Sequence, residues 1–301
     1  MIRKNITFPM LLALLIFCFS AKAQEEKKDI PEALVFETLH EGTFHGVKLR
    51  YKAIAGETHL KNADGEPVAS IWSTSYLKED PNPSRRPVTF IFNGGPGSAS
   101  VWLHMGVFGP KVVHVDSDAR IDDGAAPFEV IDNDLALLDI TDLVFVDPVG
   151  TGYSKVIGKG KNEDFWGLTE DARSIAQFMR LWITRNQRWQ SPKYLAGESF
   201  GTTRAVAVTA ALEGGGQTMA LNGLILISQA LDYQGSTSVH DNIASYFTYF
   251  PTMAATAWYH GKAGQGKKLE DFLQEAREFA YQIYLQALYP GNQLSTENKI
   301  T

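Results

Sequence analysis

Four short, uninterrupted apolar runs are the feature that most limits how this chain can fold. Runs of strand length without polar alternation are typical of strands that are buried on both faces, as in a parallel sheet covered by helices. Three of the runs are followed by a glycine-rich segment. The runs are Pro87–Phe92, Leu143–Val146, Tyr194–Ala196 and Leu224–Ile227.

Helical patterns separate the later runs. Residues 169–189 place an apolar stripe at helical spacing, with Asp171 and several arginines away from it. Residues 202–212 are rich in alanine and valine and end at three glycines, a typical helix stop. Upstream, residues 47–55 and 67–77 indicate two strands joined by a turn-rich segment. This order of strands and helices predicts an α/β fold with right-handed crossovers.

The sequence changes character after Ser228. Residues 238–290 contain successive helical patterns with many aromatic side chains and no clear strand. We therefore expect an α/β core over residues 24–230 and a helical cap or insertion over residues 231–301.

The segment GESFG at 197–201 is a G-x-S-x-G motif, with a predicted strand before it and a small-residue helix after it. In this context the motif predicts a nucleophile elbow, a strained turn that holds the Ser199 hydroxyl above the sheet. The flanking glycines are needed because the neighbouring backbone comes too close for side chains. The alternative is an ordinary glycine-lined turn between a strand and a helix.

Two other glycine-rich loops follow predicted strands, NGGPG at 93–97 and DPVGTGYS at 147–154. The first can aim a backbone N–H group into a cleft, and the N–H group of Phe200 would be a second donor. Acyl transfer needs two such donors where the carbonyl oxygen becomes negative. The second loop lies where open α/β sheets bind ligands. We expect the three loops to converge on one cleft, although each alone is compatible with a simple turn.

Taken together, NGGPGSAS at 93–100, DPVGTGYS at 147–154 and GESFG at 197–201 resemble the serine carboxypeptidase family of α/β hydrolases. The order and spacing match across residues 40–260, and GGPGSASVWLHMG is similar to bacterial, exported members. The resemblance implies an α/β-hydrolase fold, here incomplete, with a mostly parallel sheet flanked by helices and a helical cap over the substrate cleft.

The resemblance also assigns roles to residues. It implies that Ser199 is the catalytic nucleophile and that the N–H groups of Gly95 and Phe200 form the oxyanion hole. It implies that Asn93 and Glu198 hold the terminal carboxylate of a peptide. The substrate-binding residues implied by the resemblance are Asn93, Gly94 and Glu198.

The sequence departs from the family pattern at two supports of carboxylate binding. Family members often carry a tryptophan and an acid where this chain has Ile91 and Val107, which puts strict carboxypeptidase specificity in doubt.

The family's catalytic acid and histidine follow the serine, in segments resembling Gly-x-x-Asp and Gly-His-Met. No such segment follows Ser199. We interpret His240 and His260 as solvated or structural, and His104 precedes the serine. We therefore expect this chain to be the N-terminal portion of such an enzyme.

The first 23 residues predict a secretory signal peptide. Arg3 and Lys4 precede an apolar run from Phe8 to Ser20, and AKA at 21–23 is a small-residue cleavage site. We expect cleavage after Ala23 and a secreted or periplasmic protein with no stable membrane span. The alternative is an N-terminal anchor that is not cleaved.

Charge and composition exclude several function classes. Removing the signal peptide changes the formal net charge from −6 to −9 and removes Cys18, the only cysteine. An acidic exported chain is a poor candidate for binding nucleic acid. The sequence has no H-E-x-x-H or paired metal-ligand pattern, so we expect neither a metal nor another cofactor.

These observations favour a serine-type carboxypeptidase that removes C-terminal residues through an acyl-enzyme. The expected partner is a peptide substrate with a free C-terminus. An esterase or acyltransferase of the same fold remains an alternative, because the elbow and the oxyanion hole do not specify an amide. A non-catalytic peptide-binding fragment is a second alternative. The sequence contains no signal for the oligomeric state.

Overall fold

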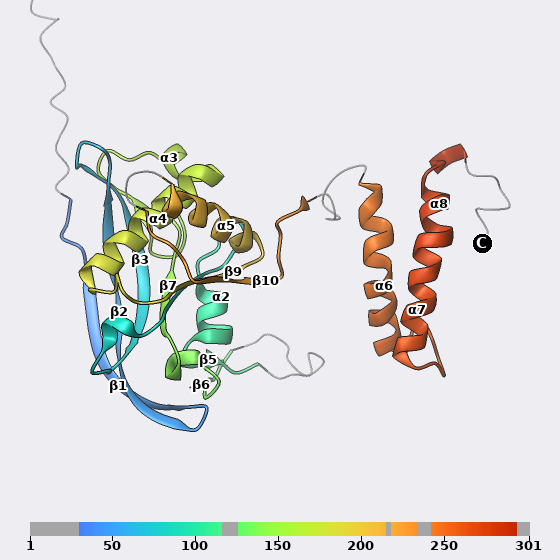
Figure 1. The fold of residues 1–301 in the computed structure, drawn as a ribbon, viewed down its shortest axis with the longest axis horizontal. Coiled ribbons are helices and arrows are strands. Elements are labelled where there is room, and N and C mark those ends of the chain that lie inside the picture. The colour runs from blue at the N-terminus through green and yellow to red at the C-terminus, as the bar shows by residue number, and fades with distance from the viewer. Residues whose placement is uncertain (1–29, 116–125, 215–217, 234–241, 294–301) are drawn as a thin grey trace, which may run out of the picture.

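A mixed eight-stranded sheet forms the centre of the α/β core (Figure 1). The structure is a computed structural model that describes residues 30–115, 126–214, 218–233 and 242–293. The strand order is β1-β2-β3-β7-β4-β9-β10, and β8 pairs with β3. The strands are β1 (Val35–Phe44), β2 (Val47–Lys61), β3 (Pro67–Lys78), β4 (Val88–Phe92), β7 (Asp142–Val146), β8 (Lys155–Val156), β9 (Lys193–Glu198) and β10 (Gly223–Ile227).

The four apolar runs are strands β4, β7, β9 and β10, as predicted, and they run parallel to one another. Strand β4 lies between β7 and β9, so the chain passes from β4 to β7 on one side and later returns to β9 on the other. A strand order that reverses in this way leaves a crevice at the carboxyl ends of the strands. The three predicted loops leave the sheet at this crevice.

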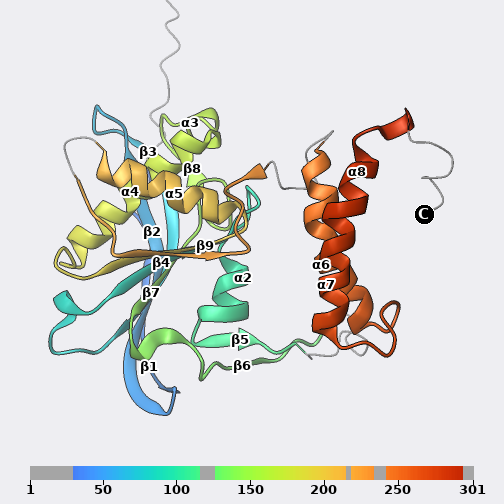
Figure 2. The same ribbon diagram turned by 45° about the vertical axis from the view of Figure 1, so that its right-hand side comes forward.

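Helices pack on both faces of the parallel strands, as predicted (Figure 2). Helices α4 (Leu168–Arg185) and α5 (Phe200–Glu213) cover one face, where they meet Phe90 and Phe92 of β4. Ile91, between these two residues, joins a second cluster that includes Leu103 of α2 (Val101–Leu103). Burial on both faces explains why the strand sequences are apolar without alternation.

The antiparallel strands β1, β2 and β3 extend the sheet beyond β7. Strands β2 and β3 begin where the sequence predicts, but β2 continues to Lys61. Strand β1 was not predicted. Its residues are almost all exposed, so no buried face imposes a period on its sequence, and pairing with β2 along its whole length decides its conformation.

Helices occupy the region where the sequence predicts them after the core. They are α6 (Ile243–Tyr259), α7 (Leu269–Phe279) and α8 (Leu285–Leu288), and residues 280–284 join α7 to α8. Aromatic pairs hold this region together: the Phe247 and Tyr281 rings lie 5.4 Å apart, and those of Phe250 and Phe279 lie 5.2 Å apart.

The boundaries 24–230 and 231–301 stay predictions, as does the role of the helices as a cap. The predicted signal peptide, residues 1–23, lies outside the described residues. Among the helices of the described ranges, none combines the length and apolar composition that crossing a bilayer requires.

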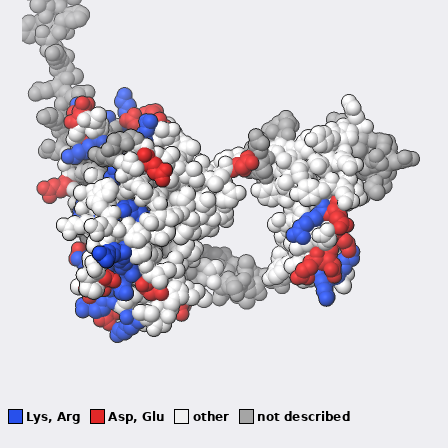
Figure 3. Space-filling model, in the orientation of Figure 1, with Lys and Arg blue, Asp and Glu red and all other residues white. Residues whose placement is uncertain are grey.

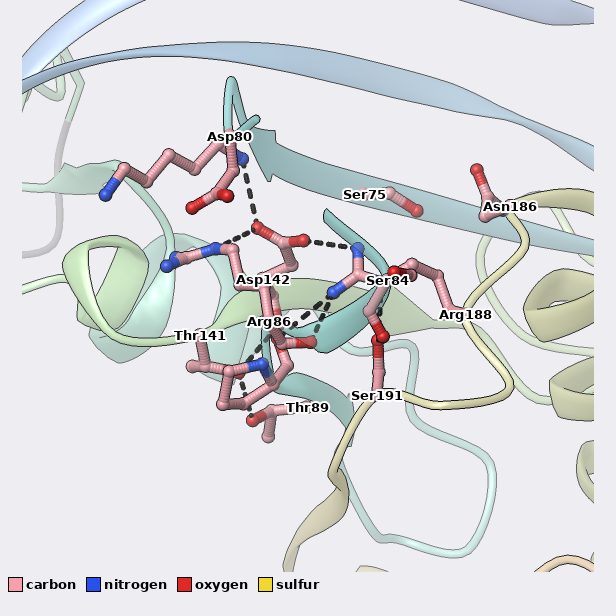
Figure 4. A network of polar contacts seen from close by, with 12 residues as sticks. Ser75, Asp80, Ser84, Arg86, Thr89, Thr141, Asp142, Asn186, Arg188 and Ser191 are labelled. Carbon is pink, nitrogen blue, oxygen red and sulfur yellow. Dashed lines mark hydrogen bonds and ion pairs between the residues drawn. The ribbon is translucent and has the colours of Figure 1, made fainter. Parts of the chain in front are cut away.

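A buried ion-pair network ties together the amino-terminal ends of the parallel strands (Figure 4). The Asp142 carboxylate, at the start of β7, accepts a hydrogen bond from Arg86 Nε at 2.8 Å and another from Arg188 Nη1 at 2.5 Å. Arg188 also donates to the Arg86 carbonyl and to Ser191 Oγ. Because all three charged side chains are almost fully buried, removing Asp142 would leave two buried positive charges without a partner.

Strand β10 forms one edge of the described sheet. Among the described residues it pairs only with β9. Its apolar residues Leu224, Ile225 and Leu226 are 37–38% exposed, whereas Leu195 and Ala196 of β9 are fully buried. Figure 3 shows few charged side chains on the flank of the core that carries α5 and β10. An uncovered apolar strand edge is a template for pairing with another chain.

We expect the purified 301-residue chain to self-associate through β10. The double substitution Leu224→Lys and Leu226→Lys should shift the chain toward monomer, because like charges on an edge strand oppose pairing. Sedimentation velocity measures this shift. Val206→Lys is the matched control, since Val206 of α5 is 43% exposed but does not lie on a strand edge. A wild-type chain that sediments as a monomer would contradict the prediction.

Candidate active site

Ser199 occupies a strained turn between β9 and α5, as the elbow motif predicts. Its backbone has φ +56° and ψ −124°, a conformation that residues other than glycine rarely adopt. Its neighbours hold it there: Ser199 N donates to the Ile227 carbonyl at 2.9 Å, and Thr202 Oγ1 donates to the Ser199 carbonyl at 2.7 Å. Strain that the surrounding structure imposes in this way is typical of functional sites.

The glycines that flank Ser199 are required by backbone crowding. A Cβ atom on Gly197 would lie 2.2 Å from the Gly201 carbonyl oxygen, and one on Gly201 would lie 2.9 Å from the Phe92 carbonyl oxygen. Neither position can hold a side chain unless the backbone moves. The interpretation of the motif as an elbow, rather than an ordinary turn, agrees with this geometry.

The loop after β4 packs directly on the elbow. A Cβ atom on Gly94 would lie 2.5 Å from the Phe200 amide nitrogen and 2.7 Å from the Glu198 carbonyl oxygen. Gly95 has φ +107°, which favours glycine, and it is exposed. The Phe200 amide belongs to the first turn of α5, where N–H groups have no partner within the helix. The two proposed oxyanion donors therefore come from backbone segments in close contact.

Asn93 and Glu198 also meet at the carboxyl ends of β4 and β9. Asn93 Nδ2 donates to Glu198 Oε2 at 3.1 Å, and Asn93 Oδ1 accepts a hydrogen bond from the Leu103 amide at 3.0 Å. Asn93 is buried and Glu198 is half-buried. The Leu103 contact orients the Asn93 side chain, so its amide nitrogen faces the carboxylate.

Asp147 connects the loop at 147–154 to the segment at 93–100. Its Oδ1 accepts a hydrogen bond from the Ser100 amide at 2.8 Å, and the Tyr153 amide also donates to it. Burial raises the pKa of the Asp147 carboxyl above its usual range, against the effect of these two amides. The sequence predicts this loop but indicates no role for Asp147. The three loops converge, as predicted.

Residues 72–281 match the profile of a family described as serine carboxypeptidase. The chain belongs to the serine carboxypeptidase family. The resemblance stated from the three motifs is therefore confirmed, and so is the α/β-hydrolase fold that it implied.

This chain matches only part of the length of its relatives in the family. "Serine carboxypeptidase-like 16" of Arabidopsis thaliana is 24% identical over 165 residues, which are 52% of this chain and 36% of the relative. "Serine carboxypeptidase-like 51" of the same plant is 31% identical over 152 residues, 48% of this chain and 30% of the relative. The chain thus spans about a third of the length of the curated relatives that it matches.

Solved structures are similar at low identity. The prohormone-processing carboxypeptidase Kex1 of Saccharomyces cerevisiae is 19% identical, with a TM-score of 0.49, over 83% of this chain and 51% of that chain. A proline iminopeptidase of Mycobacterium smegmatis is 16% identical, with a TM-score of 0.37, over 74% of this chain and 59% of that chain.

The two departures from the family pattern occupy different environments. Ile91 is fully buried in the core beneath the site, whereas Val107 is 49% exposed. Neither side chain can donate or accept a hydrogen bond, so neither can support the Asn93–Glu198 pair by hydrogen bonding.

A buried ion pair beside the elbow does not follow from the sequence pattern. Asp171 was predicted on the polar side of its helix, but it is buried, because Arg204 Nε donates to Asp171 Oδ2 at 2.6 Å. Burial raises the pKa of the Asp171 carboxyl, and the Arg204 charge opposes that rise. One signal could have indicated the pair: Arg204 is the only charged residue in the apolar helix sequence 200–212.

A cavity of about 300 Å³ lies beside this pair. The loops at 93–97 and 147–154, the region before α4 and the start of α5 line it. Three aromatic side chains contribute to its wall. They are Phe165, Trp166 and Phe200. In the part of the chain that the structure describes, no group of three His, Cys, Asp or Glu side chains could hold a metal ion.

The histidines considered in sequence analysis lie in separate places. The His104 ring stacks on Phe145 with centroids 4.3 Å apart, and its Nε2 shares a hydrogen bond of 2.7 Å with the Tyr76 hydroxyl. Burial lowers the pKa of His104 to about 4. His260 is exposed at the end of α6, and His240 lies outside the described residues. The contacts of His104 indicate a structural role.

The low pKa of His104 predicts a specific dependence of stability on pH. Above pH 6.5 both the folded and unfolded states hold His104 neutral, and this contribution to stability is complete. Between pH 6.5 and about 4 the unfolded state takes up the proton first, so the free energy of unfolding should fall by about 3 kcal/mol.

Urea unfolding of wild type and His104→Gln across this pH range measures the effect. The difference in stability between the two proteins should change with pH in the stated direction, which separates His104 from other titrating groups. A difference that is constant with pH would contradict the prediction.

Proposed function

We propose that this protein acts as an exported serine carboxypeptidase that removes C-terminal residues from peptides, with Ser199 as its nucleophile. The observation that carries the proposal is the packing of the Gly94–Gly95 loop on a strained serine elbow, with Asn93 and Glu198 paired at the same point. Membership of the serine carboxypeptidase family supports it. Export rests on the signal-peptide pattern of residues 1–23, with Gln24 as the first residue of the mature chain.

In the proposed reaction, Ser199 Oγ attacks the carbonyl carbon of the last peptide bond. The N–H groups of Gly95 and Phe200 stabilise the negative oxygen that develops. The peptide C–N bond then breaks, the departing amine takes up a proton, and an acyl-enzyme remains on Ser199. Water hydrolyses this ester and restores the serine. In this reaction class a histidine takes and returns the serine proton.

Asn93 and Glu198 would bind the terminal carboxylate of the peptide. Asn93 Nδ2 can donate a hydrogen bond, and Glu198 can donate one only when it is protonated. Gly94 supplies the close backbone approach that brings this pair to the elbow. The apolar side chains of Ile91 and Val107 leave the pair without two supports that the family often has. That observation keeps an esterase or acyltransferase as the second candidate function.

Fluorophosphonate labelling of the protein tests whether Ser199 is the nucleophile. Only an activated serine reacts with this reagent, so the label should be found at Ser199 and at no other serine. Ser199→Ala should abolish both labelling and turnover while the far-UV circular dichroism spectrum is unchanged.

Ser228→Ala is the matched control for this experiment. Ser228 also has a positive φ, +49°, at the end of the neighbouring strand β10. Its substitution should leave the labelling intact. Persistent labelling of Ser199→Ala would remove the elbow from the mechanism.

The pH dependence of KM tests carboxylate recognition. Two carboxylates within hydrogen-bond reach share a proton, so binding of a free-acid peptide favours protonated Glu198. KM for such peptides should therefore rise as pH increases, and it should rise less for the matching C-terminal amides. Glu198→Gln keeps a donor without a charge, so this variant should flatten the profile.

Parallel KM profiles for acid and amide substrates, unchanged by Glu198→Gln, would mean that Glu198 does not bind the terminal carboxylate. Equal or faster hydrolysis of matched esters would then favour the esterase alternative.

A further inference from the structure

Arg204 is a buried cation at the junction of the elbow and the first loop. It is 2% exposed and lies in the first turns of α5, four residues after Phe200. Its guanidinium carbon lies 5.3 Å from the centre of the Phe200 ring and 5.5 Å from that of Phe92. Phe92 directly precedes the first loop and Phe200 directly follows Ser199, so Arg204 contacts both segments of the site.

Two hydrogen bonds fix the orientation of the Arg204 guanidinium. Arg204 Nη1 donates to the Asn93 carbonyl oxygen at 2.6 Å, and Arg204 Nε donates to Asp171 Oδ2 of α4 at 2.6 Å. The Asn93 carbonyl belongs to the peptide plane that carries the Gly94 N–H group. A hydrogen bond to that oxygen restricts the rotation of the backbone that leads to Gly95.

We propose that Arg204 is a positioning residue that holds the Asn93–Gly95 backbone against the elbow, so that the Gly95 and Phe200 N–H groups face one point. This inference rests on the proposed function, because it assigns the oxyanion hole to those two amides. A planar guanidinium with several fixed donors can bond a carboxylate and a carbonyl at once. Asp171 orients Arg204 and balances its buried charge.

The alternative is that Arg204 and Asp171 are simply an ion pair that stabilises the fold. The two roles predict different results when the ion pair is replaced by apolar side chains. Replacing a buried ion pair by apolar side chains of similar size often restores stability. The same replacement cannot restore a hydrogen bond to the Asn93 carbonyl.

The experiment compares three variants of the full-length protein: Arg204→Met, Asp171→Asn, and the double variant Arg204→Met with Asp171→Leu. Three readouts are taken: urea unfolding, kcat and KM on a peptide substrate, and amide hydrogen exchange of residues 93–100. Asp171→Asn still offers an oxygen to Arg204 Nε. It should lose stability, because the buried Arg204 charge is no longer balanced, but it should keep exchange in residues 93–100 slow, with kcat within about threefold of wild type.

Arg204→Met should accelerate exchange in residues 93–100 and lower kcat by about 100-fold, with a smaller change in KM, because small misplacements of catalytic groups have effects of this size. The double variant should regain most of the lost stability, while its exchange stays fast and its kcat stays low. Recovery of slow exchange and kcat together with stability would overturn the proposal. Failure of both Arg204 variants to fold would also overturn it, since the pair would then support the whole fold.

Arg188→Met is the matched control. Arg188 is another buried arginine paired with an aspartate, Asp142, but it lies at the amino-terminal ends of the strands (Figure 4). This variant should lose stability without faster exchange in residues 93–100. Hydrogen exchange does not depend on turnover. A wild-type protein without turnover or labelling would therefore contradict the proposed function, while exchange in the Arg204 variants would still decide the positioning role.

Discussion

The close approach of two backbone segments, residues 93–95 and 197–201, is the constraint on which the candidate site depends. Side chains are excluded from Gly94, Gly197 and Gly201 because a Cβ atom at each would lie within 3 Å of neighbouring backbone. This crowding follows from the position of β4, which lies between β7 and β9 and pairs with both. The serine turn is therefore built by the sheet, and its strained backbone is held by hydrogen bonds with Ile227 and with the buried Thr202.

Polar networks stabilise the parallel strands at both of their ends, and the two networks have different consequences. At the amino-terminal ends, Asp142 balances Arg86 and Arg188 within a fully buried cluster. At the carboxyl ends, Asp147, Asn93 and Arg204 connect loops that carry the candidate chemistry. The ion-pair network fixes the amino-terminal ends of the parallel strands. At the carboxyl ends, buried hydrogen bonds fix the loops, so these loops can be exposed and strained without losing their positions.

The reaction proposed for the site needs donors that do not move when charge develops on the substrate. Backbone amides meet this need only if the peptide planes that carry them are fixed. In this protein the fixing groups come from outside the elbow motif. Asp147 lies after β7, Asp171 on α4 and Arg204 in the second turn of α5. The motif identifies the candidate nucleophile, and residues distant in sequence define the geometry around it.

The parallel strands, the two core helices and the elbow could be predicted from the sequence, because burial on two faces and a glycine-flanked turn leave local patterns. Strand β1 could not be predicted, since its exposed residues follow no period and its partner strand sets its register. Asp171 was misplaced for a related reason. Helical periodicity assigns a carboxylate to the solvent side, and only the arrival of Arg204 from another helix allows it to be buried. The structural role of His104 also depends on contacts between distant segments, with Tyr76 and Phe145. The sequence by itself determined the parallel strands, the two core helices, the meeting of their loops and the serine that stands at the turn. Tertiary structure alone decided which charges are buried and which exposed strand pairs with the sheet, because those outcomes depend on partners that are far apart along the chain.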